Sequence, residues 1–311
     1  MPTYANILTE QLVSLAGKVP DSVEVLQLAQ PNVGTVQKRL TALASTVAEL
    51  TGLDAKKAEV INEKDRTLVQ LPGQLRAVGF HASGALSAQL ALGPFEDVFK
   101  DDPGDRELTG MLGQAADRLG LGGLLPADDT LGFERLWRIK AAGGDQSGTL
   151  SPPVLCRAVG AFRHATHGIP VYGRASATVE LAQGGRLASL SMSARRSAED
   201  GGGKTVATPE VRRPEAAAKE VAARVVKALG GLEDLKGTRI VPEWFRFGYL
   251  SLGRRRTQAL LAPFYFASIS LKDTETEASA HVIAVPGTDE QFVALPTGQR
   301  SPDQSDRART A

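Results

Sequence analysis

Residues 167–191 read HGIPVYGRASATVELAQGGRLASLS, and apolar and polar residues alternate along most of this stretch. Between residues 171 and 181, one parity carries only apolar residues and glycine, while the other is mostly polar. Such alternation is typical of a strand that buries one face. A second alternating run, 186–194, follows a glycine pair at 184–185 that favours a tight turn. We therefore predict an antiparallel hairpin of Val171–Leu181 and Arg186–Ala194, turning at Gln183–Gly185.

The sequence on both sides of this hairpin predicts a sheet with one helix packed on it. Residues 156–166, which precede it, are expected to form a strand. After a polar loop at 197–213, a helix is expected from Pro214, because proline suits a first helical turn and Gly230 and Gly231 would end the helix. Three further runs are predicted to be strands: 239–250, 259–271 and 279–285. A helix on one face of an antiparallel sheet is an α+β arrangement, which is the fold class we expect for the C-terminal half.

Residues 1–125 are predicted to be a mainly helical region that precedes this sheet. Apolar residues at helical spacing fall on one face between Thr35 and Gly52, and a second such set ends before Gly120. Residues 67–92 have scattered glycines and no clear period, so one or two strands are expected there. This divides the chain into a helical region of unknown type at 1–125, a hairpin region at 126–196, a helix-and-strand region at 197–295 and a disordered tail at 296–311.

The turn that opens the hairpin carries a family resemblance. Residues 168–173, GIPVYG, resemble the G-[IL]-P-V-[FY]-G turn of FTP (fungalysin/thermolysin propeptide) modules. The strand at 156–166 takes the place of a Tyr/Gln-rich strand in that family, but it carries Phe162, Arg163 and His164 instead. The helix from Pro214 and the apolar run 260–271, LLAPFYFASISL, resemble a PepSY domain, the usual neighbour of an FTP module. The resemblance covers roughly half the chain and makes 126–196 FTP-like and 197–295 PepSY-like.

The resemblance implies a binding role. FTP and PepSY modules precede secreted metallopeptidases, act as folding templates for them and inhibit them until removed. The peptidase itself would contain HExxH, and no glutamate follows any of the four histidines. We therefore expect a non-enzymatic, propeptide-like inhibitor or folding chaperone of a protein partner, for example a metallopeptidase encoded elsewhere. Two alternatives stay open: a scaffold protein that uses this fold structurally, and a carrier of a small apolar ligand.

The expected partner-binding surface is the turn itself. Pro170 lacks the N–H that a central strand would need, so the turn is predicted to lie at an end or edge of the sheet, where a partner can reach it. Tyr172 and Arg174 fall on the polar face by parity. The expected partner-binding residues are His167, Gly168, Ile169, Pro170, Val171, Tyr172 and Arg174.

Several other residues have side chains that could take part in chemistry. His164 and His167 form H-x-x-H, but three-residue spacing at a strand end puts the two rings on opposite faces, so no metal is expected to bridge them. Cys156, the single cysteine, forms no intramolecular disulfide and is expected to be a small buried hydrophobe. Residues 203–205, GKT, lack the first glycine of a phosphate loop. The arginines at 254–256 are expected in a hairpin loop between strands, and the aromatic residues of 244–249 in the core.

Composition narrows the class of partner. The net charge of +1 gives no general reason to expect nucleic acid or a membrane surface as a partner. No stretch approaches the roughly 20 apolar residues of a membrane-spanning helix. The first residues do not form a signal peptide, so a cytoplasmic location is expected, or a secreted one if a leader has been removed or another export route is used. No cofactor is expected, and the sequence leaves the oligomeric state open.

Overall fold

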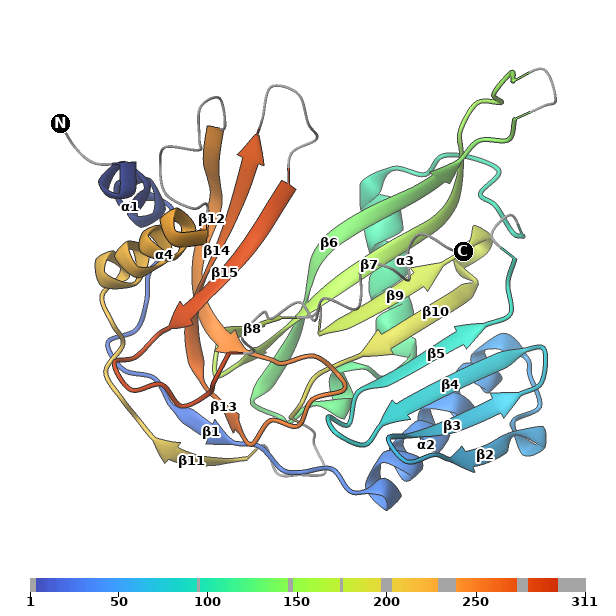
Figure 1. The fold of residues 1–311 in the computed structure, drawn as a ribbon. Coiled ribbons are helices and arrows are strands. Elements are labelled where there is room, and N and C mark those ends of the chain that lie inside the picture. Colours follow the sequence, from blue (N-terminus) through green and yellow to red (C-terminus); the bar gives the residue numbers. More distant parts are fainter. Residues whose placement is uncertain are drawn as a thin grey trace, which may run out of the picture.

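The computed structural model describes residues 4–93, 96–144, 148–173, 176–196, 203–228, 239–272 and 279–295. It is a mixed α+β fold in which helices cover one side of a long, mainly antiparallel sheet, as Figure 1 shows. Arg174, the residues expected to end the second-half helix and the tail at 296–311 lie outside the described residues. No helix in the described part of the chain has the length and apolar character needed to cross a membrane.

Four α-helices lie in the described residues. They are α1 (Tyr4–Ser14), α2 (Val33–Thr51), α3 (Asp105–Arg118) and α4 (Pro214–Ala228), and short 3-10 turns lie at Ala55–Lys57, Gly122–Leu124 and Gln183–Gly185. The strands are β1 (Val25–Gln27), β2 (Glu59–Asn62), β3 (Arg66–Leu71), β4 (Leu75–Phe80), β5 (Leu86–Leu90), β6 (Asp129–Ala141), β7 (Val154–Thr166), β8 (Ile169–Tyr172), β9 (Ala177–Leu181), β10 (Leu187–Met192), β11 (Lys204–Ala207), β12 (Arg239–Leu250), β13 (Leu260–Leu261), β14 (Pro263–Lys272) and β15 (Ser279–Pro286).

The strands of the described residues form two sheets. The large one has the order β15-β14-β12-β8-β7-β9-β10-β5-β4-β3-β2, with β6 also paired to β7. Every neighbouring pair is antiparallel except β8 and β12, which run parallel. In the small sheet, β1 lies between β11 and β13. The four-residue strand β8 therefore joins a part built on β7 to a part built on β12, and Figure 1 shows these as two wings.

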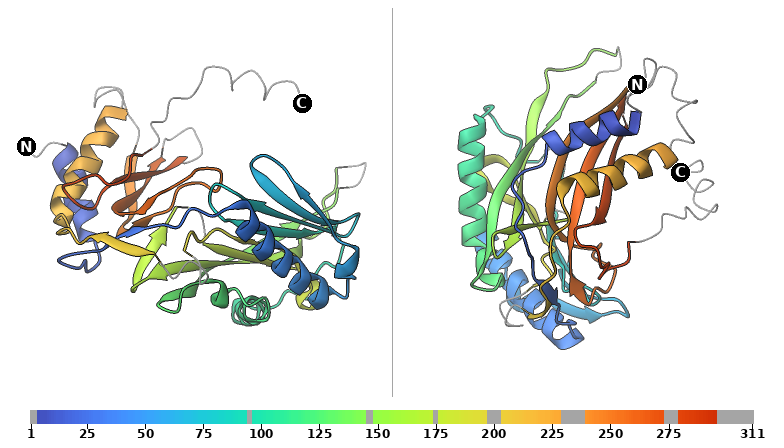
Figure 2. Two further views of the ribbon diagram at one scale, coloured as in Figure 1. Left: turned by 90° about the horizontal axis from the view of Figure 1, so that it is seen from below. Right: turned by 90° about the vertical axis from the view of Figure 1, so that its left-hand side faces the viewer.

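Each wing has its own helical layer. In the larger wing, α2 is capped at its start by Asn32, whose side chain accepts a hydrogen bond from the amide of Thr35, and at its end by Gly52 in the left-handed conformation. Its apolar face packs on β3, β4 and β5, while α3 packs on β7 and β9. In the other wing, α1 and α4 pack against each other and against β12 and β15 (Figure 2). The small side chains of Ala218 and Ala222 are fully buried in that contact region.

The predicted hairpin is confirmed in its second half and wrong in its first. β9 and β10 pair antiparallel, and the turn lies at Gln183–Gly185 as expected. The run 171–181 is not one strand, because β8 ends at Tyr172 and β9 begins at Ala177. Gly173 lies directly after β8, where the break begins. Its φ of 129° suits glycine, and a Cβ there would lie 2.1 Å from the carbonyl oxygen of Ser251.

The prediction that the turn lies at an end or edge of the sheet is confirmed in part, because the turn lies at the end of β7, but β8 is not an edge strand. β8 is bordered by β7 on one side and by β12 on the other. Pro170 is tolerated there because it faces Ala165 on β7, while pairing with β12 starts only at Val171, opposite Tyr249. β12 approaches closely at Gly248, where a Cβ would lie 2.4 Å from the carbonyl oxygen of Pro170.

The first 125 residues contain more strand than expected. The helices α1, α2 and α3 are present, but 59–90 forms four strands, and three of them, β3 to β5, fall in the stretch 67–92 where one or two were predicted. These strands join the same sheet as the C-terminal half, since β5 pairs with β10. The core strands bury alternate residues, such as Ala77 and Leu86, on the α2 side. The strands are short and glycine-interrupted, so no long period marks them in the sequence.

Candidate functional site: a groove and a polar cluster at the β7–β8 turn

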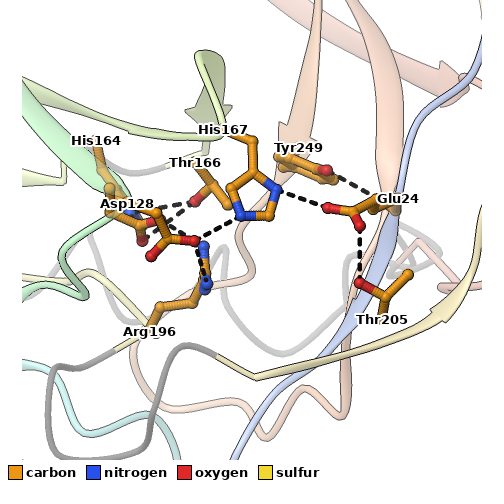
Figure 3. A network of polar contacts seen from close by, with 9 residues as sticks. Glu24, Asp128, His164, Thr166, His167, Arg196, Thr205 and Tyr249 are labelled. Atoms are coloured by element: carbon orange, nitrogen blue, oxygen red, sulfur yellow. Dashed lines mark hydrogen bonds and ion pairs between the residues drawn. The ribbon is translucent and has the colours of Figure 1, made fainter.

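The tight turn between β7 and β8 places His167 between two carboxylates (Figure 3). His167 and Gly168 both have positive φ, 50° and 77°, and this brings the chain straight back along β7. His167 Nδ1 lies 2.6 Å from Oε2 of Glu24, the residue that precedes β1. Its Nε2 lies 2.6 Å from Oδ2 of Asp128, the residue that precedes β6. Three segments distant in sequence therefore meet at one half-exposed imidazole.

The two carboxylates contact the ring in different ways. His167 Nε2 is hydrogen-bonded to Asp128, and the contact of Nδ1 with Glu24 is an ion pair only when the ring is protonated. The hydrogen bond from His167 is the main cause that lowers the pKa of Asp128 below its usual value. Glu24 is also held by Thr205 of β11, whose hydroxyl donates to Oε1 at 2.9 Å. The turn is thereby tied to both sheets.

A second, buried polar cluster lies directly beneath. His164 Nε2 lies 2.6 Å from Asp129 Oδ2, and Thr166 Oγ1 donates to the same oxygen at 3.3 Å. Arg196 donates to Asp129 Oδ1 and also lies 3.5 Å from Asp128. The side chains of Asp129, His164 and Arg196 are 0%, 1% and 4% exposed. This charge-paired cluster joins β6, β7 and the segment after β10 under the turn.

A solvent-open groove of about 580 Å³ runs beside His167. One wall is the segment 17–24, and the other is formed by the turn, β8 and β12. The segment is fixed in place, because the amide of Val211 donates to the carbonyl of Asp21 and the amide of Val23 to that of Pro209. The hydroxyl of Tyr249 donates to the backbone carbonyl of Glu24 across the groove floor, and burial raises the pKa of this tyrosine.

The groove contains most of the expected partner-binding residues. Those that line it are His167, Gly168, Ile169, Pro170 and Tyr172. Val171 does not, because it is buried in the core beside Tyr249. Sequence reasoning missed the opposite wall, notably Lys18 and Glu24, and the exposed Arg246 of β12. Nothing local marks those residues, since only the tertiary fold brings them to the turn.

The other candidate residues have plain structural places. The two histidines contact different carboxylates, His164 binding Asp129 and His167 binding Asp128. Among the described residues, no group of three or more His, Cys, Asp or Glu is arranged to hold a metal ion. Cys156 is buried, as expected.

The remaining predictions concern the loops and the aromatic run. The run 203–205 leads into strand β11, whereas a phosphate loop would lead into a helix. Phe245 and Tyr249 are fully buried core residues, as predicted, while Phe247 is partly buried and lines the groove. The arginines at 254–256 lie in the loop between β12 and β13, also as predicted.

Comparison with known proteins finds a shared fold. No family model matches the chain, and no curated protein matches it. Among solved structures, an uncharacterized protein from Eubacterium rectale ATCC 33656 is similar, with a TM-score of 0.53 and 10% sequence identity. The match covers 89% of this chain and 87% of that one, so the similarity extends over both wings. At this identity the likeness concerns the fold alone, and the resemblance to FTP and PepSY modules stays a prediction.

Proposed function

We propose that this chain is a non-enzymatic binding protein that holds an extended segment of a protein partner in the groove beside His167. The observation that carries the proposal is that the GIPVY turn forms part of one wall of an open groove. The same turn carries the resemblance to propeptide modules. The proposal therefore includes an inhibitor or folding chaperone of a partner such as a metallopeptidase.

The chemistry of the groove suits a peptide. Apolar surface from Ile169, Pro170 and Phe247 lies beside charged groups from Lys18 and Arg246. Concave sites that combine apolar lining with a few placed polar groups fix both affinity and orientation. β8 is paired on both sides, so the partner would be held by side chains at this point and not by adding a strand. Lys18 and Arg246 favour a partner segment with an acidic residue.

Of the two alternatives, one has an observation in its favour. A carrier of a small apolar ligand needs an enclosed apolar cavity, and this groove is open and charged. A scaffold role gains support from β6, which pairs only with β7 among the described strands and exposes Phe133, Trp137 and Ile139. Exposed apolar residues on an unpaired strand edge are typical of sites where another chain docks. This second surface lies on a different strand and can be tested separately.

The test compares variants of the full chain in capture from a lysate of the native host. Lys18→Glu combined with Arg246→Glu reverses the groove's charge at two exposed side chains. Arg106→Glu, an exposed arginine on α3, is the matched control. We expect the groove variant to lose a partner that the wild type and the control both retain, and direct titration with the identified partner to repeat this order. Equal binding by all three proteins would refute the groove, and loss only in a Trp137→Glu variant would favour the scaffold role.

Inhibition would identify the partner class. If the partner is a metallopeptidase, adding the wild-type chain should reduce its hydrolysis of a peptide substrate, while the groove variant should not. Binding without inhibition would favour a chaperone or scaffold role over an inhibitor.

A further inference from the structure

The imidazole of His167 lies between two carboxylates, and a neutral ring has a hydrogen for only one of them. A neutral imidazole has one N–H and one lone pair, whereas an imidazolium has two N–H groups. Nε2 is hydrogen-bonded to Asp128, and Nδ1 lies 2.6 Å from Glu24, as Figure 3 shows. When a neutral ring donates to Asp128, the lone pair of Nδ1 faces an oxygen of Glu24. The contact with Glu24 is therefore attractive only while the ring is protonated.

Loss of the ring proton changes the surroundings of Glu24 more than those of Asp128. Asp128 keeps its hydrogen bond from Nε2 and its contact of 3.5 Å with Arg196. Oε2 of Glu24 loses an ion pair, while Oε1 keeps the hydrogen bond from Thr205. The side chains of His167 and Glu24 are both 37% exposed, so water can exchange a proton with the ring and solvate the released carboxylate. The change therefore falls on the carboxylate that lines the groove.

The backbone around Glu24 has supports that do not involve the ring. Amide hydrogen bonds tie the segment 17–24 to Pro209 and Val211, and the hydroxyl of Tyr249 donates to the carbonyl of Glu24. Deprotonation of His167 therefore alters the charge of the groove and leaves its walls in place.

The charge of the groove depends on one titrating residue. Among the described residues that line it, the charged and ionisable side chains other than tyrosine are Lys18, Glu24, His167 and Arg246. With an imidazolium they are three cations and one carboxylate, and with a neutral ring two cations and one carboxylate. Histidine is the residue type whose charge ordinarily changes between about pH 5 and pH 8. The positive surplus of the groove is therefore halved across this range.

The other ionisable groups packed around the ring lie outside this change. Hydrogen bonding from His167 lowers the pKa of Asp128, and burial raises the pKa of Tyr249, so one stays a carboxylate and the other a neutral hydroxyl. Beneath the turn, His164 and Asp129 contact each other with side chains that are 1% and 0% exposed. Their pair is buried, and Arg196 donates to the same carboxylate.

We propose that His167 is a pH-controlled switch that sets the charge of the groove. Its imidazolium holds the carboxylate of Glu24 at the turn, and its neutral form leaves this carboxylate facing the groove as an uncompensated negative group. An acidic segment of a partner, which is the part that rests on the function proposed above, is then held below about pH 6 and released above about pH 7, because like charges in a binding site repel.

Nitrogen NMR of the full chain, labelled with 15N-histidine, tests the switch without a partner. The chain has four histidines, and a His167→Asn variant assigns the signals of interest. Asparagine tolerates the φ of 50° at this position. We expect the ring to change from the doubly protonated form to the Nε2–H form between about pH 5 and pH 8.

A matched pair of variants shows whether Glu24 is the partner that responds. In Glu24→Gln the ring should lose its proton at a lower pH than in the wild type, because a nearby carboxylate favours the charged ring and an amide does not. Glu59→Gln removes an exposed carboxylate on β2, at the other end of the large sheet, and should leave the titration of His167 unchanged.

A short blocked peptide that carries aspartates among apolar residues is the probe for the groove, and its charge stays constant over the range used. Its affinity for the wild-type chain should fall by about fivefold between about pH 5.5 and pH 8, as expected for the loss of one half-exposed charge. In His167→Asn the affinity should no longer depend on pH.

The outcomes separate the switch from the proposed function. A ring that keeps one protonation state over the range, or equal titration shifts in Glu24→Gln and Glu59→Gln, would overturn the switch. Peptide binding by the wild type with the same affinity at both pH values would overturn its control of the groove. The expected titration without peptide binding at either pH would support the switch at Glu24 and refute the acidic-segment function.

Discussion

Replacing Asp129 by alanine should destabilise the fold strongly. Asp129 is fully buried and is the acceptor shared by His164, Thr166 and Arg196. Alanine removes the fully buried carboxylate that pairs with Arg196, together with the acceptor used by the other two side chains. The guanidinium then stays in a region where only 4% of its side chain is exposed.

The size of the effect follows from these contacts. Breaking a buried ion pair by removing one partner typically costs about 3–5 kcal/mol, because the remaining charge is left uncompensated. Arg196 keeps a contact of 3.5 Å with the half-exposed side chain of Asp128, and this contact offsets part of that cost. We therefore expect a loss of about 3 kcal/mol in the free energy of unfolding. A typical domain has only about 5–15 kcal/mol in total.

Urea denaturation followed by far-UV circular dichroism measures the loss. Asp102→Ala is the matched control, because Asp102 pairs with Arg138 and Lys140 at the surface, where solvent screens such pairs and they add little to stability. A double variant, Asp129→Leu with Arg196→Met, removes both charges and should recover much of the stability, since apolar replacement of a buried pair is often near neutral. The reasoning fails if Asp129→Ala costs no more than the control, or if the double variant is no more stable than Asp129→Ala.

Three further outcomes are expected. Gly173→Ala should lower the free energy of unfolding, measured by urea denaturation, by at least about 2 kcal/mol. The added Cβ would lie 2.1 Å from the carbonyl oxygen of Ser251, at a φ that disfavours alanine. A smaller loss would contradict this steric argument. Phe245→Ala should lower the free energy of unfolding by about 3–5 kcal/mol, since the ring is fully buried, and a cost below about 1 kcal/mol would contradict its place in the core. Asp128→Asn should cost less than about 1 kcal/mol at neutral pH, because the pair with His167 is half-exposed. The pKa of Asp128 is lowered in the folded state, so its carboxylate stabilises the fold above about pH 4 and this contribution is lost as the pH falls below that value. A difference in stability between the wild type and Asp128→Asn that persists at lower pH would contradict this role of the carboxylate.

Local pattern accounts for the elements that the sequence predicted. The hairpin at Gln183–Gly185 follows from alternation and a glycine pair, and both are properties of adjacent residues. The strand β12 begins and ends where its apolar run does, at Arg239–Leu250, and α4 begins at Pro214. The shorter β2 to β5 were not all predicted, because strands of four to six residues with intervening glycines give too few periods to recognise.

The sequence by itself determined that the chain is α+β, that its second half is a hairpin, a helix and strands, and that the turn at 167–172 is exceptional. Only the tertiary structure decided what this turn does, because strand order and register depend on contacts between residues far apart in the chain. The pairing of β8 with both β7 and β12 made β8 an inner strand and placed the turn at its start as part of a groove wall. The same long-range packing brought Glu24 and Asp128 to His167. The periodicity of apolar residues indicates which face of a helix or strand is buried, but it does not indicate which other helix or strand packs against that face.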